Sequence, residues 1–103
     1  MLKQNKPVKV FNVLEKIHTC IKQERYVFTN HALDRVKERG IDIQTTIYVL
    51  LNGHEEKQKT KLDVNTAVWK YAIRGVTVDS DDVRVIVAFE NEDMLVITVM
   101  YVL

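Results

Sequence analysis

The chain has 103 residues, of which 47% are hydrophobic and 28% charged, with 3 glycines, 1 proline and 1 cysteine. This composition predicts one globular domain over residues 1–103, with residues 1–7 as a flexible start. It excludes a disordered chain, a collagen-like repeat and a disulfide scaffold, because a single cysteine forms no internal bridge. No apolar run reaches the ~20 residues of a membrane helix, so we expect a cytoplasmic protein.

The net charge is +1, but the charges are unevenly distributed along the chain. Residues 1–25 hold six basic and two acidic side chains, and residues 26–75 hold eight basic and six acidic ones. Residues 76–103 hold one basic and six acidic side chains. A basic part opposite an acidic part would orient a phosphate chain, or would only keep the surface soluble. Charge by itself favours the second interpretation.

The first predicted element is an amphipathic helix. Between Val8 and Arg25 apolar residues recur at spacings of three and four, with charged residues between them. This period is that of a helix with one buried side. The next residues, Tyr26–Phe28, are expected to form a short connector to a second helix.

Capping residues delimit two further helices. Thr29 or Asn30 is suited to cap a second helix, and Gly40 follows its last turn, where a left-handed residue is favoured. Asp42 is suited to cap a third helix, which spans Ile43–Leu51 and is strongly apolar. The N-terminal half is therefore predicted to be helical.

After the third helix the apolar period changes from 3.6 to 2, which indicates strands. Residues 54–61 are polar with alternating lysines and predict an exposed edge strand, and residues 67–75, 83–90 and 94–102 predict three longer strands. Helices followed by hairpin-connected strands indicate an α+β fold. We expect two to three N-terminal helices on one face of a three- to four-stranded, mostly antiparallel sheet.

Two kinds of site are disfavoured by the spacing of residues. His18 and Cys20 are two apart on a predicted helix and point in different directions, and the chain has no second cysteine. We therefore predict no metal site and no cofactor. The second and third helices resemble a DNA-reading pair in their short connection, but Ile43–Leu51 has no Lys or Arg to contact phosphate.

One edge of the predicted second helix carries an ordered set of side chains. His31, Arg35 and Arg39 follow one another at intervals of four, so they line the same side of the helix. This edge is either a solvated surface with local ion pairs, or a stripe that holds phosphates beside a group titrating near neutral pH.

The run from His31 to Ile41 has the form HAxxRxxxRGI, and a late strand ends in Ile97–Tyr101. These features resemble a bacterial family known only as a domain of unknown function, which is grouped with RelE-like toxins. Over residues 8–103 the layout is also similar to MqsR-type messenger-RNA interferases. The resemblance implies a RelE-like fold and a cofactor-free endoribonuclease of a toxin–antitoxin system, acting on RNA, often at the ribosome, and blocked by an antitoxin protein.

RNA cleavage by the 2′-hydroxyl without a metal needs a proton acceptor, a proton donor and cations that hold the phosphate charge. Strand alternation places such cations on the sheet face turned away from the helices. Under this interpretation His31 or His54 acts as acid or base, and Tyr101 supplies a phenol. The cations predicted to stabilise the phosphate are Lys70, Arg74 and Arg84.

The other basic residues are predicted to bind the RNA backbone. On the second helix these are Arg35 and Arg39, and on the edge strand they are Lys57, Lys59 and Lys61. Lysines on an exposed strand also protect it against sheet-to-sheet aggregation, which is the alternative explanation for them. A different class of function stays open as well, a catalytically silent module that binds a protein partner through a sheet edge or a helix face.

Overall fold

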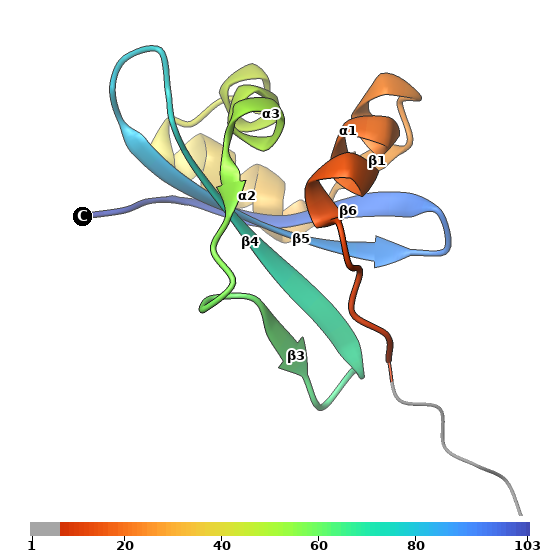
Figure 1. The fold of residues 1–103 in the computed structure, drawn as a ribbon. Helices are drawn as coiled ribbons and strands as arrows, with labels where there is room; N and C mark the ends of the chain where they lie inside the picture. The colour runs from red at the N-terminus through yellow and green to blue at the C-terminus, as the bar shows by residue number, and fades with distance from the viewer. Residues whose placement is uncertain (1–6) are drawn as a thin grey trace, which may run out of the picture.

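The computed structural model describes residues 7–103, so residues 1–6 of the predicted flexible start, which spans residues 1–7, lie outside the described residues. Figure 1 shows a sheet with helices around it, which confirms the α+β class. The elements in chain order are α1 (Val13–Lys22), β1 (Tyr26–Phe28), α2 (Asn30–Arg39), α3 (Ile43–Asn52), β2 (His54–Glu55), β3 (Lys61–Asp63), β4 (Val68–Val76), β5 (Asp82–Glu90) and β6 (Asp93–Tyr101).

The sheet has six strands, more than the three to four predicted. Its order is β1-β6-β5-β4-β2, and β3 pairs with β4 as well. The three long strands are antiparallel neighbours, whereas β1 runs parallel to β6. Tyr26–Phe28, predicted to be a connector, is a strand because it pairs with Met94–Val96, a partner far along the chain.

The predicted edge strand over residues 54–61 is interrupted. Its two ends, β2 and β3, pair with β4, but residues 57–59 form a turn between them. In this turn the backbone N–H of Lys59 donates to the Glu56 carbonyl at 2.9 Å. The three lysines therefore do not alternate along one strand, and that prediction is wrong.

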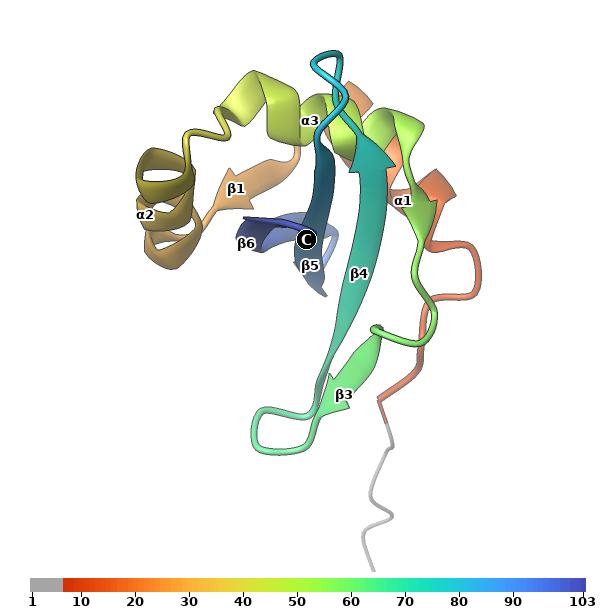
Figure 2. The ribbon, with the colours of Figure 1, turned by 90° about the vertical axis from the view of Figure 1, so that its left-hand side faces the viewer.

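The helices do not share one face of the sheet. Helices α1 and α3 lie on one side, whereas α2 lies along β6, beyond the end of β1 (Figures 1 and 2). The Thr29 N–H, at the start of α2, donates to the Val96 carbonyl at 3.0 Å. Arg39, at its other end, donates to the Val99 carbonyl at 2.6 Å. These bonds to the β6 backbone hold α2 at the sheet edge, contrary to the prediction.

The predicted caps of α2 and α3 are confirmed. Thr29 accepts the Ala32 N–H at 3.1 Å, Asp42 accepts the Thr45 N–H at 2.7 Å, and Gly40 has a left-handed φ of 66°. Helix α1 is shorter than predicted, because it begins at Val13 after an Asn12 cap. The residues before Asn12, which the prediction included in the helix, are therefore not helical.

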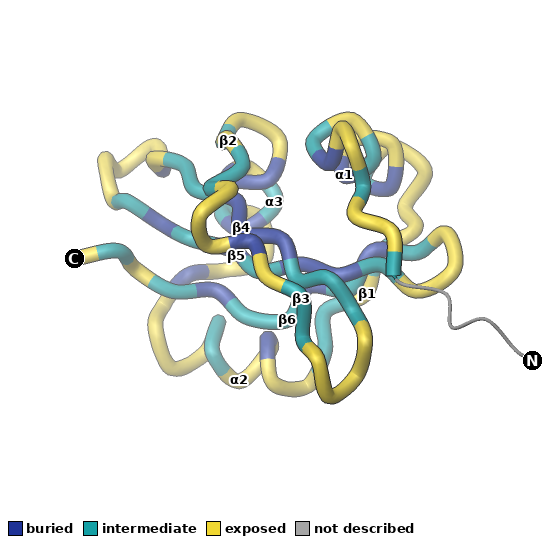
Figure 3. Tube along the Cα trace, turned by 60° about the horizontal axis from the view of Figure 1, so that its bottom comes forward, coloured by how far each residue is buried: buried dark blue, intermediate teal, exposed yellow. Residues whose placement is uncertain are grey.

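The core lies between the sheet and the pair α1 and α3. Figure 3 shows the buried segments running along the central strands and the inner sides of these helices. Fully buried side chains include Ile17 from α1, Leu50 from α3, Ile73 from β4 and Val85 from β5. None of the helices in the described part of the chain is long and apolar enough to cross a membrane.

Candidate functional site

The three long strands turn one face away from α1 and α3, and this face is called the outer face below. Tyr71 and Ile73 of β4 are buried on the helix side, so Lys70 and Arg74, which alternate with them, lie on the outer face. Arg84 is the direct cross-strand neighbour of Arg74. The prediction that Lys70, Arg74 and Arg84 share a face is confirmed.

Glu56 binds both arginines of this face. Its side chain is 14% exposed and accepts from Arg84 Nε at 2.5 Å and from Arg84 Nη2 at 3.2 Å. Arg74 Nη1 donates to the same carboxylate at 3.2 Å, and Arg74 also donates to Asp82 at 2.9 and 2.5 Å. Glu56, Arg74, Arg84 and Asp82 together are called the outer-face cluster.

Hydrogen bonds in the cluster stabilise its charged forms. The bond from Arg84 lowers the pKa of Glu56 below its ordinary value of 4.5, against the opposing effect of burial, and Arg74 adds to the lowering. The pKa of Asp82 is lowered first by its bond from Arg74. The pKa of each guanidinium is raised. At neutral pH the cluster therefore holds two positive and two negative charges.

His54 lies beside this cluster. On β2 it is the register partner of Arg74, and its charge contributes to the lowered pKa of Asp82. The close approach of α3 to β4 at Gly53 permits this pairing. A Cβ on Gly53 would lie 2.5 Å from the Arg74 carbonyl oxygen, so this position has room only for glycine.

The predicted RNA-binding lysines lie at the β4 edge. Lys57 and Lys59 are exposed in the turn, and Lys61 on β3 pairs in register with Lys70. Lys70 itself forms an ion pair with Asp63 at 3.0 Å. The lysines therefore border the outer face without forming the continuous cationic strand that the sequence predicts.

The stripe of α2 lies at the opposite edge, along β6. His31 is exposed in the first turn, Arg35 forms an ion pair with Glu38, and Arg39 donates to the β6 backbone. The sheet order places the outer-face cluster on the strands between this stripe and the lysine turn. The structure thus arranges the predicted RNA-binding groups on two borders of one surface, with α2 and β3 well separated in Figure 2.

Tyr101 does not share the outer face. It is the register partner of Val83, which is fully buried on the helix side, whereas the outer-face position beside it is Met100, the partner of Arg84. The structure therefore separates the phenol from the arginines. Sequence reasoning missed Glu56 and Asp82, although the His54-x-Glu56 spacing in a predicted strand is the signal that places both side chains on one face.

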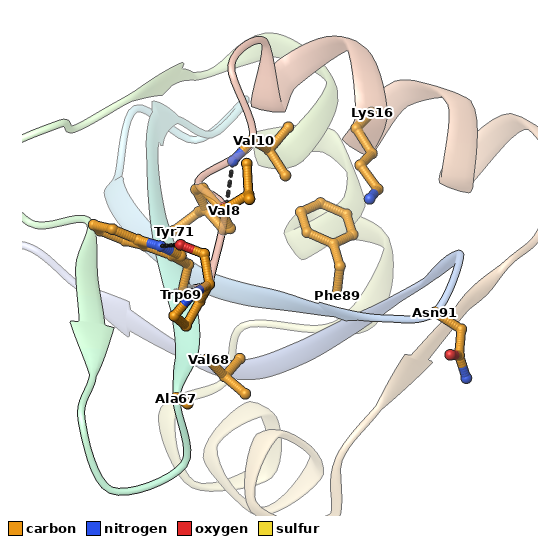
Figure 4. Close-up of a pocket in the computed structure, with 10 residues that line it drawn as sticks. Val8, Val10, Lys16, Ala67, Val68, Trp69, Tyr71, Phe89 and Asn91 are labelled. Carbon is orange, nitrogen blue, oxygen red and sulfur yellow. Dashed lines mark hydrogen bonds between the residues drawn. The ribbon is translucent and has the colours of Figure 1, made fainter. Parts of the chain in front are cut away.

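A separate pocket of about 220 Å³ lies on the helix side, where the start of the described chain crosses β4 (Figure 4). Trp69 Nε1 donates to the Pro7 carbonyl at 3.3 Å, and the Tyr71 hydroxyl accepts the Val10 N–H at 2.7 Å. Pro7, the last residue of the predicted flexible start, therefore contacts β4 through its carbonyl. This pocket contains no part of the outer-face cluster.

A family model described as "Domain of unknown function (DUF4258)" matches residues 28–101. The matched residues run from the end of β1 to the end of β6 and contain the whole outer-face cluster, whereas α1 precedes them. No curated protein and no solved structure matches the chain.

Proposed function

The chain belongs to the DUF4258 family of domains of unknown function, and we propose that it is a toxin-like endoribonuclease of RelE-like type. In this proposal the enzyme needs no metal, and its active site consists of the outer-face cluster and His54. One observation carries the proposal: the Glu56 carboxylate is held between two guanidiniums beside an imidazole, on the sheet face turned away from α1 and α3. These are the group types that metal-free RNA cleavage requires.

In the proposed reaction Glu56 takes the proton of a ribose 2′-hydroxyl, and the 2′-oxygen attacks the neighbouring phosphorus. The bond from phosphorus to the 5′-oxygen breaks, and the protonated His54 imidazole gives its proton to that oxygen. The products are a 2′,3′-cyclic phosphate and a 5′-hydroxyl. Arg74 and Arg84 stabilise the charge that builds on the phosphate oxygens, because guanidinium forks match them.

Substrate binding would also change the basicity of Glu56. Without substrate, the bonds from Arg84 and Arg74 lower the pKa of its carboxylate, which makes it a weak base. A phosphate that draws the guanidiniums to itself removes these bonds, so the pKa of Glu56 rises towards its ordinary value. The base is thereby strengthened only when the scissile phosphate is in place.

The two borders of the outer face supply a path for the RNA backbone in this proposal. The lysine turn at the β4 edge and Arg35 and Arg39 at the β6 edge contact phosphates on either side of the scissile bond. Lys70 supports the same path from β4. An antitoxin protein would inhibit the enzyme by covering this face, and translating ribosomes would present the messenger RNA. The proposal therefore includes a cytoplasmic location for the activity.

A catalytically silent protein-interaction module is the second candidate. It is favoured by the ion pairs on the outer face, since Lys70, Arg74 and Arg84 each have a carboxylate partner. Paired cations attract RNA less strongly than free ones, and a partner protein with a matching charge pattern would be recognised instead.

The test is cleavage of total RNA by the purified chain in EDTA and, in a separate arm with magnesium, cleavage of messenger RNA on translating ribosomes, each followed by mass spectrometry of the new RNA ends. We expect 2′,3′-cyclic phosphate ends from the wild type, and about 100-fold or more slower cleavage by Glu56→Gln. Asp93→Asn is the matched control, because Asp93 pairs with Arg25 at an exposed site at the start of β6, whereas Arg84 of the cluster pairs in register with Met100 near its end. A folded wild type that leaves RNA intact under both conditions refutes the nuclease and favours the second candidate.

A further inference from the structure

Beside the outer-face cluster lies a pocket of about 570 Å³, a volume within the range of small-ligand sites. It is formed where the end of α3 meets β2, β4 and β5. Its lining includes Tyr48, Asn52, His54, Arg74, Val76 and Asp82. The pocket thus joins polar groups of the proposed nuclease site to an aromatic side chain that the proposed reaction does not use.

Tyr48 has open space on more than one side. The residue is 40% exposed and also lines a second pocket of about 230 Å³, together with Thr45 and Val78. Figure 2 shows the β4–β5 loop, which carries Val78, beside α3. Val76 and Val78 are 59% and 78% exposed, so this rim of the nuclease site is apolar as well as aromatic.

We propose that Tyr48 stacks on a nucleobase of single-stranded RNA, next to the scissile phosphate held by Arg74. An aromatic ring beside a guanidinium suits a nucleotide, because the ring takes the base and the guanidinium takes the phosphate. Val76 and Val78 add apolar surface for the base. The Asn52 amide, which donates to the Tyr48 carbonyl at 2.9 Å, lies in the same pocket as a polar group for a base edge.

This inference rests on the proposed function and adds a base-binding subsite to it. It predicts that the enzyme acts on unpaired RNA, because a base in a duplex is stacked on its neighbours and closed to the tyrosine ring. It also predicts that one nucleotide position of the substrate contributes more to binding through its base than the others do.

The experiment measures binding of fully 2′-O-methylated oligonucleotides, which the 2′-hydroxyl mechanism cannot cleave, by fluorescence anisotropy. One series carries a single abasic site at each position in turn. We expect one abasic position to weaken wild-type binding roughly ten-fold. Tyr48→Ala should remove this preference for the base, while Tyr48→Phe should keep it. Leu51→Ala is the control, because Leu51 lies on the same helix and is 42% exposed, much like Tyr48. This variant should bind as the wild type does.

The outcomes separate the subsite from the nuclease. If wild type and Tyr48→Ala respond equally to the abasic series while both still cleave RNA, the subsite is refuted and the nuclease stands. If wild type cleaves no RNA and binds no oligonucleotide, the nuclease and the subsite are both refuted. Loss of the base preference in Tyr48→Phe would also contradict ring stacking, because phenylalanine keeps the ring.

Discussion

The Arg84 guanidinium donates two hydrogen bonds to the Glu56 carboxylate. Arg84 Nε donates to one carboxylate oxygen at 2.5 Å, and Arg84 Nη2 donates to the other at 3.2 Å. The Arg84 side chain is 17% exposed and that of Glu56 14%, so both charged groups are largely removed from water. Such a pair is retained only with its hydrogen bonds made, because each group alone is costly to bury. The same pair therefore holds the segment between β2 and β3 against β5 and provides two groups of the proposed active site.

Arg84→Lys should destabilise the fold although the charge is kept. A lysine has one ammonium on a flexible stem and cannot reproduce the two-bond fork, so we expect a loss of about 1–2 kcal/mol. For a domain of this size that lowers Tm by roughly 5–15 °C, measured by thermal denaturation. Arg25→Lys is the control, because the Arg25–Asp93 pair is 44% and 48% exposed and contributes little. Equal shifts in the two variants would contradict the assignment.

Stability should fall in acid through the cluster carboxylates. The folded pKa of Glu56 is depressed below 4.5 and that of Asp82 below 3.8. A depressed folded pKa contributes stability that is fully present above the ordinary value and is lost as the pH falls through the depressed value. Urea denaturation from pH 6 down to about pH 2 should show this decline. Glu56→Gln should show a shallower decline, and an unchanged slope would refute the contribution of Glu56.

Two glycines should respond oppositely to the same pair of substitutions. Gly53 lies in close contact, with a Cβ placed 2.5 Å from the Arg74 oxygen and 2.7 Å from the Val49 oxygen, whereas Gly40 has open space but a φ of 66°. Gly53→Ala should cost about 1–3 kcal/mol and Gly53→Asn more. Gly40→Ala should cost about 1–2 kcal/mol and Gly40→Asn less, because asparagine tolerates the left-handed region. Chemical denaturation measures all four, and the same order at both sites would contradict this explanation.

Tyr71→Phe should loosen the start of the described chain while the core persists. The lost hydroxyl accepts the Val10 N–H at 2.7 Å, whereas the ring packs edge-on against Phe89 with centroids 5.7 Å apart and would stay buried. We expect about 1 kcal/mol of lost stability and faster proteolysis before α1. Cleavage at the wild-type rate would show that other contacts hold this segment.

The sequence indicated the helices and long strands well, because their signals are local. Thr29, Gly40 and Asp42 cap or end helices through bonds to residues close by in the chain. The alternation of apolar and polar residues along β4 and β5 predicts that Ile73 faces the core and Arg74 faces away from it, whichever strand lies beside them. The face shared by the basic residues of β4 and β5 was predictable for the same reason.

Tertiary contacts decided what local signals could not. Tyr26–Phe28 is a strand because it pairs with β6. Helix α2 lies at the sheet edge because it forms hydrogen bonds to the β6 backbone. Glu56 lies 18 and 28 positions from Arg74 and Arg84, so only the pairing of β2 with β4 brings the carboxylate between them. Sequence by itself thus determined which side chains face away from the core. The fold alone determined which of them meet, because ion pairs across strands depend on register rather than on composition.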